Sequence, residues 1–288
     1  MTGRVIKFYN SFFFVAADGE LIPCKLRGIM KRDKKVGSAV YPGDLVEISK
    51  LPDNSGVIEK ILPRKSLLNR PAVANVDKVI LTFAAANPNL HPLLLDKFIA
   101  LAEFSGLSEI IICVNKIDLL DSGENFLSDY ESLYKIVRTS TLTGAGIEEL
   151  KKILSEGVSV FAGPSGVGKS SLLNKIIPQI NLKVGSVSEK ILRGKHTTRV
   201  SELIEFGGGF VVDTPGFSAV NFQEIGLDKK NLRACFKEFA EFAKDCKFLN
   251  TCTHTHEPNC AVKDAVEKGK ILRVRYENYL ELSSQKKN

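Results

Sequence analysis

The sequence predicts a multidomain protein: a small N-terminal β-barrel, a central α/β domain with a mainly parallel sheet, and a C-terminal, mainly helical segment. Three observations carry this prediction. Five short apolar strands open the chain, apolar strands alternate with helices in the middle, and a stretch rich in cysteine and histidine precedes the last helices. We place the three domains at residues 1–65, 66–222 and 223–288.

Composition excludes several protein classes. A hydrophobic content of 44% and a charged content of 25% are ordinary for a globular protein, and 288 residues suffice for two or three domains. No apolar run approaches the roughly 20 residues of a membrane span, and Arg4, Lys7 and Asn10 interrupt any signal-peptide core. The six cysteines favour reduced thiols or a metal over disulfides, because the chain also carries a nucleotide-binding motif typical of cytosolic proteins. We expect a monomer with no membrane partner.

The net charge of +7 is unevenly distributed. It is +5 over residues 1–65, −2 over 66–224 and +4 over 225–288. A near-neutral middle between two basic ends favours flanks that bind a polyanion. A positive charge that serves only solubility is the alternative.

The N-terminal segment predicts the barrel. We expect strands at 5–9, 12–16, 21–26, 45–48 and 57–62, where β-branched or aromatic runs are separated by turn signals. Five short strands in about sixty residues suit an OB-fold. The basic stretch 27–35 is either a loop that contacts nucleic acid or an ordinary solvated loop.

The rest of the chain follows in order. Residues 63–71 are expected to be a linker. Further strands are expected at 76–84, 109–114, 134–137, 158–162, 202–206 and 209–212. Helices are expected at 91–103, 147–154, 171–177, 228–244, 262–268 and 271–282, the last of them basic through Arg273 and Arg275.

A phosphate-binding motif lies in the middle of the chain. Residues 163–170 read G-P-S-G-V-G-K-S and fit the P-loop pattern between a predicted strand and a predicted helix. The glycines let backbone N–H groups surround a phosphate at the positive end of the helix. Lys169 would contact the outer phosphates, and the hydroxyl of Ser170 would hold Mg²⁺.

A second motif predicts the base. Asn115-Lys116-Ile117-Asp118 follows a predicted strand, and the carboxylate of Asp118 can accept both guanine donors, the ring N1–H and the exocyclic amine. Adenine has no such pair, so the motif favours GTP. Asn115 and Lys116 would brace the loop and cover the base. Ser140 and Thr141, after the next strand, mark a second base-contacting loop.

Two later segments are typical of nucleotide switches. Residues 185–200 are polar and aperiodic and contain His196 and Thr198. A threonine of a switch would complete the magnesium shell, whereas an ordinary surface loop is the alternative. Asp213, in D-T-P-G, would reach magnesium through water, and the N–H of Gly216 would sense the γ-phosphate. Together with the earlier motifs they predict a P-loop GTPase.

The order of the motifs is unusual. Asp118 precedes Lys169, whereas the base-specifying motif of an ordinary small GTPase comes late, so the predicted domain is circularly permuted. Phe217 stands where many GTPases carry a water-orienting glutamine. Because an apolar side chain cannot orient water, we expect slow intrinsic hydrolysis that His196 or a partner assists.

The C-terminal segment predicts a metal site. Cys246, Cys252, His254 and Cys260 match the composition of a closed structural Zn²⁺ site, with His256 as a rival for the fourth ligand. The remaining cysteines are expected to be buried apolar thiols: Cys24, Cys113 and Cys235.

Over its whole length the chain resembles the ribosome small-subunit-dependent GTPase A family. The resemblance lies in the N-terminal barrel, the motif order N-K-x-D, P-loop, H-T-T, D-T-P-G-F, and the Cys/His segment. It implies an OB-fold, a circularly permuted GTPase and a zinc-binding domain in a cytoplasmic bacterial factor. Such a factor binds the small ribosomal subunit and its rRNA late in maturation and hydrolyses GTP when the subunit stimulates it, which governs release.

The resemblance also assigns residues. It implies a switch histidine at His196, zinc ligands at Cys246, Cys252, His254 and Cys260, and guanine contacts over Asn115, Lys116, Ile117 and Asp118. It implies a phosphate loop formed by Gly163, Pro164, Ser165, Gly166, Val167, Gly168, Lys169, Ser170 and Ser171.

The chain departs from the family pattern at two places. The gap between Cys246 and Cys252 is one residue longer than the family pattern, and the H-T-T-T run ends in Arg199, which leaves open which threonine binds magnesium. A second interpretation also stays open: an RNA-binding assembly scaffold in which guanine nucleotide is mainly a structural ligand.

Overall fold

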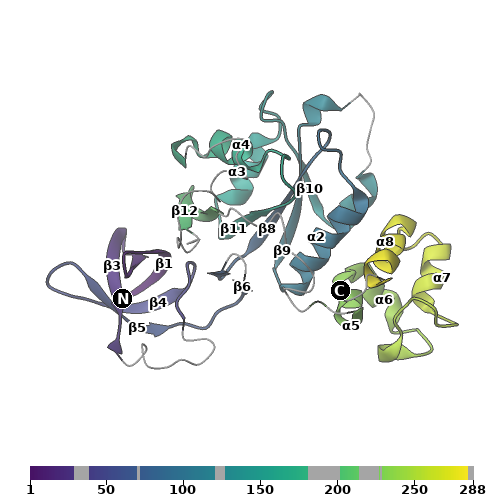
Figure 1. Cartoon of the computed structure of the whole chain (residues 1–288), viewed down its shortest axis with the longest axis horizontal. Helices are drawn as coiled ribbons and strands as arrows, with labels where there is room; N and C mark the ends of the chain where they lie inside the picture. The colour runs from purple at the N-terminus through teal and green to yellow at the C-terminus, as the bar shows by residue number, and fades with distance from the viewer. Residues whose placement is uncertain are drawn as a thin grey trace, which may run out of the picture.

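The computed structural model describes residues 1–28, 39–69, 72–120, 127–180, 202–213, 227 and 229–284. The barrel and the C-terminal helices lie on opposite sides of the central α/β sheet (Figure 1). Among the helices in these ranges, none has the length and apolarity that a bilayer span needs.

The N-terminal barrel has the five strands that the sequence predicts: β1 (Thr2–Tyr9), β2 (Phe12–Ala17), β3 (Glu20–Leu26), β4 (Leu45–Lys50) and β5 (Gly56–Ile61). They close in the order β1-β2-β3-β5-β4, with β3 parallel to β5 and the other neighbours antiparallel. This is an OB-type barrel. Its interior is filled by alternate residues such as Val5, Val15 and Ile22, and the predicted buried thiol of Cys24 lies among them.

The central domain is a six-stranded sheet in the order β10-β9-β8-β11-β13-β12. Its strands are β8 (Lys78–Ala84), β9 (Glu109–Asn115), β10 (Lys135–Arg138), β11 (Val158–Ala162), β12 (Glu202–Phe206) and β13 (Gly209–Asp213). All neighbours are parallel except β12 and β13, which form an antiparallel edge hairpin. The carboxyl ends of the parallel strands therefore meet at one edge, where sheets of this kind bind ligands.

Both faces of the sheet are covered because its strands are apolar on both sides. Helix α2 (Pro92–Phe104) packs on one face, where Leu81 and Phe83 belong to the same buried cluster as Phe98. Helices α3 (Ile147–Leu154) and α4 (Lys169–Ile176) pack on the other face, where Ile80 and Cys113 point. Short 3-10 turns complete the domain: η1 (Ile117–Leu119), η2 (Ser128–Ser132) and η3 (Pro178–Ile180).

Part of the predicted linker 63–71 is a strand. β6 (Leu67–Asn69) pairs with β7 (Ala72–Ala74), and Leu68 and Val73 are buried in the core of the central domain. The apolar pattern of this stretch is too short to distinguish a strand from a linker, and its burial comes from contacts with distant residues.

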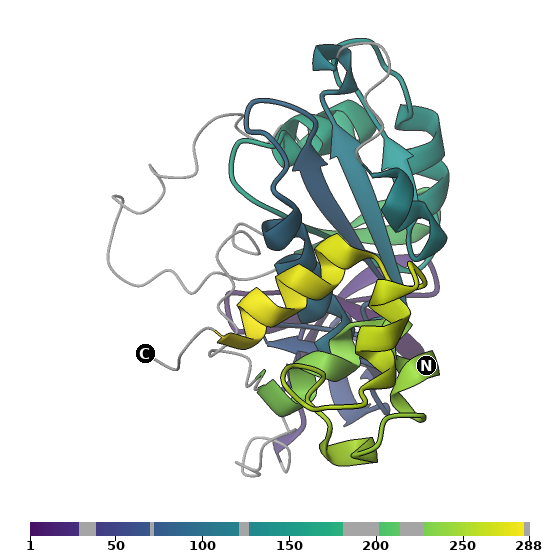
Figure 2. The ribbon, with the colours of Figure 1, turned by 90° about the vertical axis from the view of Figure 1, so that its right-hand side faces the viewer.

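The C-terminal part consists of short helices around an aromatic core. Its elements are α5 (Lys229–Leu232), η7 (Arg233–Cys235), η8 (Lys237–Phe239), α6 (Ala240–Ala243), η9 (Leu249–Thr251), α7 (Ala261–Glu267) and α8 (Arg273–Ser284). Figure 2 shows α8 running across the front of the molecule beside the other C-terminal helices. Contacts of α8 with α2 fasten this part to the central domain.

The single helix that the sequence predicts over 228–244 is wrong. Phe236 leaves the helical region, with φ −104° and ψ 82°, and the chain forms four short pieces. The break lets the rings of Phe236 and Phe239 stack at 5.3 Å and both contact Tyr279 edge-on. Burying both rings outweighs a continuous helix. Cys235 is buried beside them, as expected.

Candidate nucleotide site and metal centre

The P-loop joins β11 to α4 at the centre of the sheet's carboxyl edge. Two of its glycines are required by close contacts. A Cβ at Gly163, where φ is +137°, would lie 2.0 Å from the carbonyl oxygen of Thr82, and one at Gly168 would lie 2.3 Å from Nδ2 of Asn115. Gly168 caps the N-terminus of α4, so the positive end of the helix opens directly onto the loop.

The ammonium of Lys169 lies inside the loop. Its Nζ donates to the carbonyl oxygens of Gly163, at 2.8 Å, and Pro164, at 2.6 Å. Burial lowers the pKa of Lys169 to about 8, because water is removed from the charged form. Ser170 and Ser171 follow in the first turn of α4.

The N-K-x-D motif directly contacts the phosphate loop. Asn115, at the end of β9, is buried, and its Nδ2 donates to the carbonyl oxygen of Val167 at 2.9 Å. Lys116 is left-handed, with φ 61°, and its Nζ donates to the carbonyl oxygen of Gly166 at 2.8 Å. These two side chains join the loop after β9 to the loop after β11.

Asp118 lies beside the second predicted base loop. It is exposed in η1, and its Oδ1 accepts a hydrogen bond from the hydroxyl of Ser140. The Ser140 loop is closed by its own backbone bonds, from Ser140 N–H to Ala145 at 3.0 Å and from Gly144 N–H to Ser140 at 2.9 Å. Thr141 adjoins them in this loop. The motifs at 115–118, 140–141 and 163–171 therefore lie along one edge of the sheet.

The two switch segments fall largely outside the described residues. Asp213 ends β13, where it pairs with Glu202 of β12, but its side chain is not described. His196, Thr198, Gly216 and Phe217 lie outside the described ranges, so their roles stay predictions.

The four C-terminal ligand candidates meet in a buried cluster. The ligand atoms of Cys246, Cys252, His254 and Cys260 all lie within 4.8 Å of one another. Nδ1 of His254 is 3.6 Å from Sγ of Cys246 and 3.4 Å from Sγ of Cys260. These residues could bind a metal ion. The rival His256 is exposed and pairs with the hydroxyl of Thr255 at 2.9 Å.

One structural feature has no signal in the sequence. Arg275, on the basic helix that the sequence predicts over 271–282, has no exposed surface. Its guanidinium contacts Oδ1 of Asp96 on α2 at 2.5 Å and Oε1 of Glu238 at 2.5 Å. Burial opposes its charge, but the hydrogen bonds of Glu238 and both carboxylate charges raise the pKa of Arg275 above its usual value. No local pattern reveals this, because its partners lie far away in the sequence.

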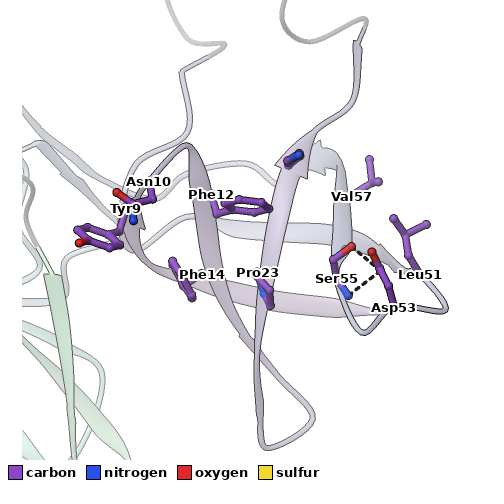
Figure 3. Close-up of a pocket in the computed structure, with 11 residues that line it drawn as sticks. Tyr9, Asn10, Phe12, Phe14, Pro23, Leu51, Asp53, Ser55 and Val57 are labelled. Atoms are coloured by element: carbon purple, nitrogen blue, oxygen red, sulfur yellow. Dashed lines mark hydrogen bonds between the residues drawn. The ribbon is translucent and has the colours of Figure 1, made fainter.

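A second feature is an aromatic cleft of about 710 Å³ on the barrel. Figure 3 shows Phe12 and Phe14 projecting from β2 beside Pro23 of β3, with Asp53 and Ser55 of the β4–β5 turn nearby. The ammonium of Lys25 lies 4.8 Å from the centre of the Phe12 ring. The alternation of Phe12 and Phe14 with the inward Val15 could have signalled this cleft. The basic stretch 27–35, which the sequence offers as a nucleic-acid loop, lies mainly outside the described residues.

Fold and site together define a circularly permuted P-loop GTPase with an N-terminal OB-type barrel and a C-terminal cluster of three cysteines and a histidine that could bind a metal ion. The chain belongs to the RsgA GTPase family: the family's GTPase profile matches residues 61–223, and the RsgA N-terminal domain profile matches residues 2–58.

The chain is similar to curated proteins over nearly its whole length. It is 45% identical over 284 residues to "Small ribosomal subunit biogenesis GTPase RsgA" of Caldanaerobacter subterraneus subsp. tengcongensis, covering 97% of this chain and 94% of that protein. It is 45% identical over 288 residues to the protein of that name in Thermotoga maritima, covering 97% and 95%.

Solved structures agree with the fold. The crystal structure of YjeQ from Thermotoga maritima matches with a TM-score of 0.84 at 42% identity, covering 98% of this chain and 96% of that one. The structure of YloQ, titled a circularly permuted GTPase, matches with a TM-score of 0.81 at 33% identity, covering 98% and 93%.

Proposed function

We propose that this chain binds the small ribosomal subunit during its biogenesis and hydrolyses GTP to GDP and phosphate when the subunit stimulates it. The observation that carries the proposal is the pair of bonds from Asn115 to Val167 and from Lys116 to Gly166, which join a guanine-selecting loop to a phosphate loop. The names of the relatives, at 42–45% identity, supply the partner.

In this proposal each motif has a defined task. Asp118 accepts the guanine donors, while Ser140 orients its carboxylate and Thr141 adjoins the base. Backbone N–H groups of the loop 163–171 and the ammonium of Lys169 hold the phosphates. Ser170 and Thr198 would hold Mg²⁺, which neutralises phosphate charge during transfer. Asp213 would reach Mg²⁺ through water, and the N–H of Gly216 would sense the γ-phosphate. His196 would assist the attacking water in place of a glutamine.

The barrel, residues 1–65 of our domain division, is proposed to bind rRNA. Its aromatic cleft is lined by Tyr9, Phe12 and Phe14, and Lys25 lies over the Phe12 ring, which combines base-stacking surface with a cation. The segment carries a net charge of +5, as expected of a surface that contacts phosphates. The GTPase domain, 66–222, lies between it and the metal-binding domain, 223–288.

We propose that the metal is one structural Zn²⁺ per chain. Sulfur atoms bonded to Zn²⁺ at about 2.3 Å in a tetrahedron lie about 3.8 Å apart. Sγ of Cys260 is 3.7 Å from that of Cys246 and 3.8 Å from that of Cys252. Three thiolates and one imidazole leave no open coordination position, so the ion would stabilise this domain rather than catalyse a reaction. We further propose a cytoplasmic monomer.

Multiple-turnover GTP hydrolysis, measured with and without purified small ribosomal subunits, tests the proposal. We expect a slow rate alone and a much faster one with subunits, and tighter subunit binding with a non-hydrolysable GTP analogue than with GDP. Nucleotide binding without any turnover in either condition would favour the scaffold interpretation instead.

A further inference from the structure

Strand β1 of the barrel also packs against the edge hairpin of the GTPase sheet. Ile6 belongs to the same buried apolar cluster as Leu203 of β12 and Val212 of β13. The guanidinium of Arg4 lies 5.4 Å from the centre of the Phe210 ring in β13. The barrel is therefore in direct contact with the hairpin β12–β13.

Lys7 of β1 lies between a residue of the GTPase domain and a residue of the barrel cleft. Its ammonium lies 2.7 Å from Oε1 of Glu202 in β12 and 5.8 Å from the centre of the Phe14 ring, which lines the aromatic cleft. The side chains of Lys7 and Glu202 are 32% and 47% exposed, so this ion pair is held loosely enough to respond to a nearby charge.

Glu202 occupies a special position in the GTPase domain. It is the first residue of β12, directly after residues 181–201, which include the predicted switch with His196. In the ladder it stands opposite Asp213, the last residue of β13, where the D-T-P-G segment begins. Both predicted switches thus join the hairpin at the end that carries the Lys7–Glu202 pair.

We propose that Lys7 and Glu202 are positioning residues that couple occupation of the barrel cleft by RNA to GTP hydrolysis. RNA bound at Phe14 brings phosphate charge near Lys7, which changes its pairing with Glu202 and thereby the position of the hairpin end from which both switches extend. The inference rests on the proposed function. It assigns the path by which the subunit stimulates the nucleotide site.

The test separates stimulation from binding. Hydrolysis is measured over a range of small-subunit concentrations for the unaltered protein and for Glu202→Gln. We expect the maximal stimulated rate of Glu202→Gln to fall by about two- to fivefold, the range open to an exposed ion pair. The subunit concentration for half-maximal stimulation should stay the same, because Glu202 lies outside the cleft.

Two further variants serve as controls. Glu20→Gln removes the partner of Lys50 in another exposed ion pair of the barrel and should leave stimulation unchanged. Lys7→Arg keeps a cation beside both Glu202 and the cleft, so it should keep the maximal rate of the unaltered protein. Thermal melting of each variant confirms that it is folded.

An unchanged maximal rate in Glu202→Gln, or an equal fall in Glu20→Gln, would overturn the inference while leaving the proposed function intact. Absence of stimulation in the unaltered protein would overturn both.

Discussion

Asp118 is the residue on which we propose that base selection depends. Its carboxylate is exposed toward solvent and oriented by the Ser140 hydroxyl, so it is available to accept two donors from guanine. The adjacent Lys116 is engaged with the phosphate loop. A change at Asp118 should therefore alter base preference without disturbing the phosphate contacts.

We expect Asp118→Asn to weaken GTP binding by roughly ten- to a hundredfold, since an unpaired polar group costs about 1–3 kcal/mol. Binding of xanthosine triphosphate should improve, because its C2 oxygen accepts from an amide donor. Titration with both nucleotides measures the change, with Asp129→Asn as an exposed control. Equal affinity of the unaltered protein for ATP and GTP would remove the assignment.

Lys169 should make GTP binding depend on pH. Burial lowers its pKa to about 8, and only the cationic form attracts the phosphates. Binding should weaken as pH rises from 7 through 8, by about tenfold between pH 7 and 9. Guanosine, which lacks phosphates, serves as the control in the same titration. A flat GTP profile over this range contradicts the role of Lys169.

At the scale of elements, β2 presents two aromatic side chains outward from the barrel. Phe12 and Phe14 are half-buried and do not belong to the apolar cluster inside the barrel, and the position of Phe12 beside Lys25 suits base stacking. The cleft is built from four strands, β1, β2, β3 and β5, and two turns, so it is a property of the barrel and not of one segment.

Phe12→Ala should weaken subunit binding by about five- to a hundredfold, the cost of one lost stacked base. GTP affinity should not change. Binding should also weaken as salt rises, because phosphate contacts release counterions. Leu21→Ala removes an exposed apolar side chain of β3 outside the cleft and is the matched control. If both variants bind subunits equally well, the cleft is not the RNA contact.

The two neighbouring histidines offer a paired test of the metal site. His254→Ala should lose most of its bound zinc, because Nδ1 of His254 lies 3.6 and 3.4 Å from two thiol sulfurs, close enough for all three atoms to bind one ion. His256→Ala should retain one zinc per chain, since His256 is exposed. Metal analysis after dialysis against a chelator measures both. Full zinc retention in His254→Ala together with zinc loss in His256→Ala would reverse the assignment.

At the scale of the whole molecule, Arg275 joins the C-terminal helices to the GTPase domain. It links α8 to Asp96 of α2 and to Glu238 of η8, while Asn278 also donates to Asp96 at 2.6 Å. The C-terminal helices are therefore fastened to the helix that covers one face of the sheet.

Arg275→Met should lower the free energy of unfolding by about 3–5 kcal/mol, because it leaves two buried carboxylates without their cation. Arg273→Met, which removes an exposed pair with Glu267, should cost less than about 1 kcal/mol. Chemical denaturation of both variants measures the difference. Similar midpoints for the two would show that the buried network adds nothing to stability.

The sequence by itself determined the class of this protein. The P-loop, the N-K-x-D motif and the cysteine-rich stretch are short segments, and the chemistry of each depends on residues that are neighbours along the chain. They can therefore be recognised without a structure, and the order of the first two identifies a permuted GTPase. Strand positions in the barrel and sheet were predictable for the same reason, since apolar periodicity is local. The roles of His196, Thr198 and Gly216 stay predictions.

Only the tertiary structure decided which distant groups meet. It buried Arg275 between two carboxylates, broke the predicted helix at Phe236, brought Asn115 to Val167, and gathered His254 rather than His256 with the thiols. Lys7 and Glu202 are separated by 195 residues in the sequence. Such pairs depend on how whole elements pack, and a local pattern carries no information about a partner that the chain reaches only after folding.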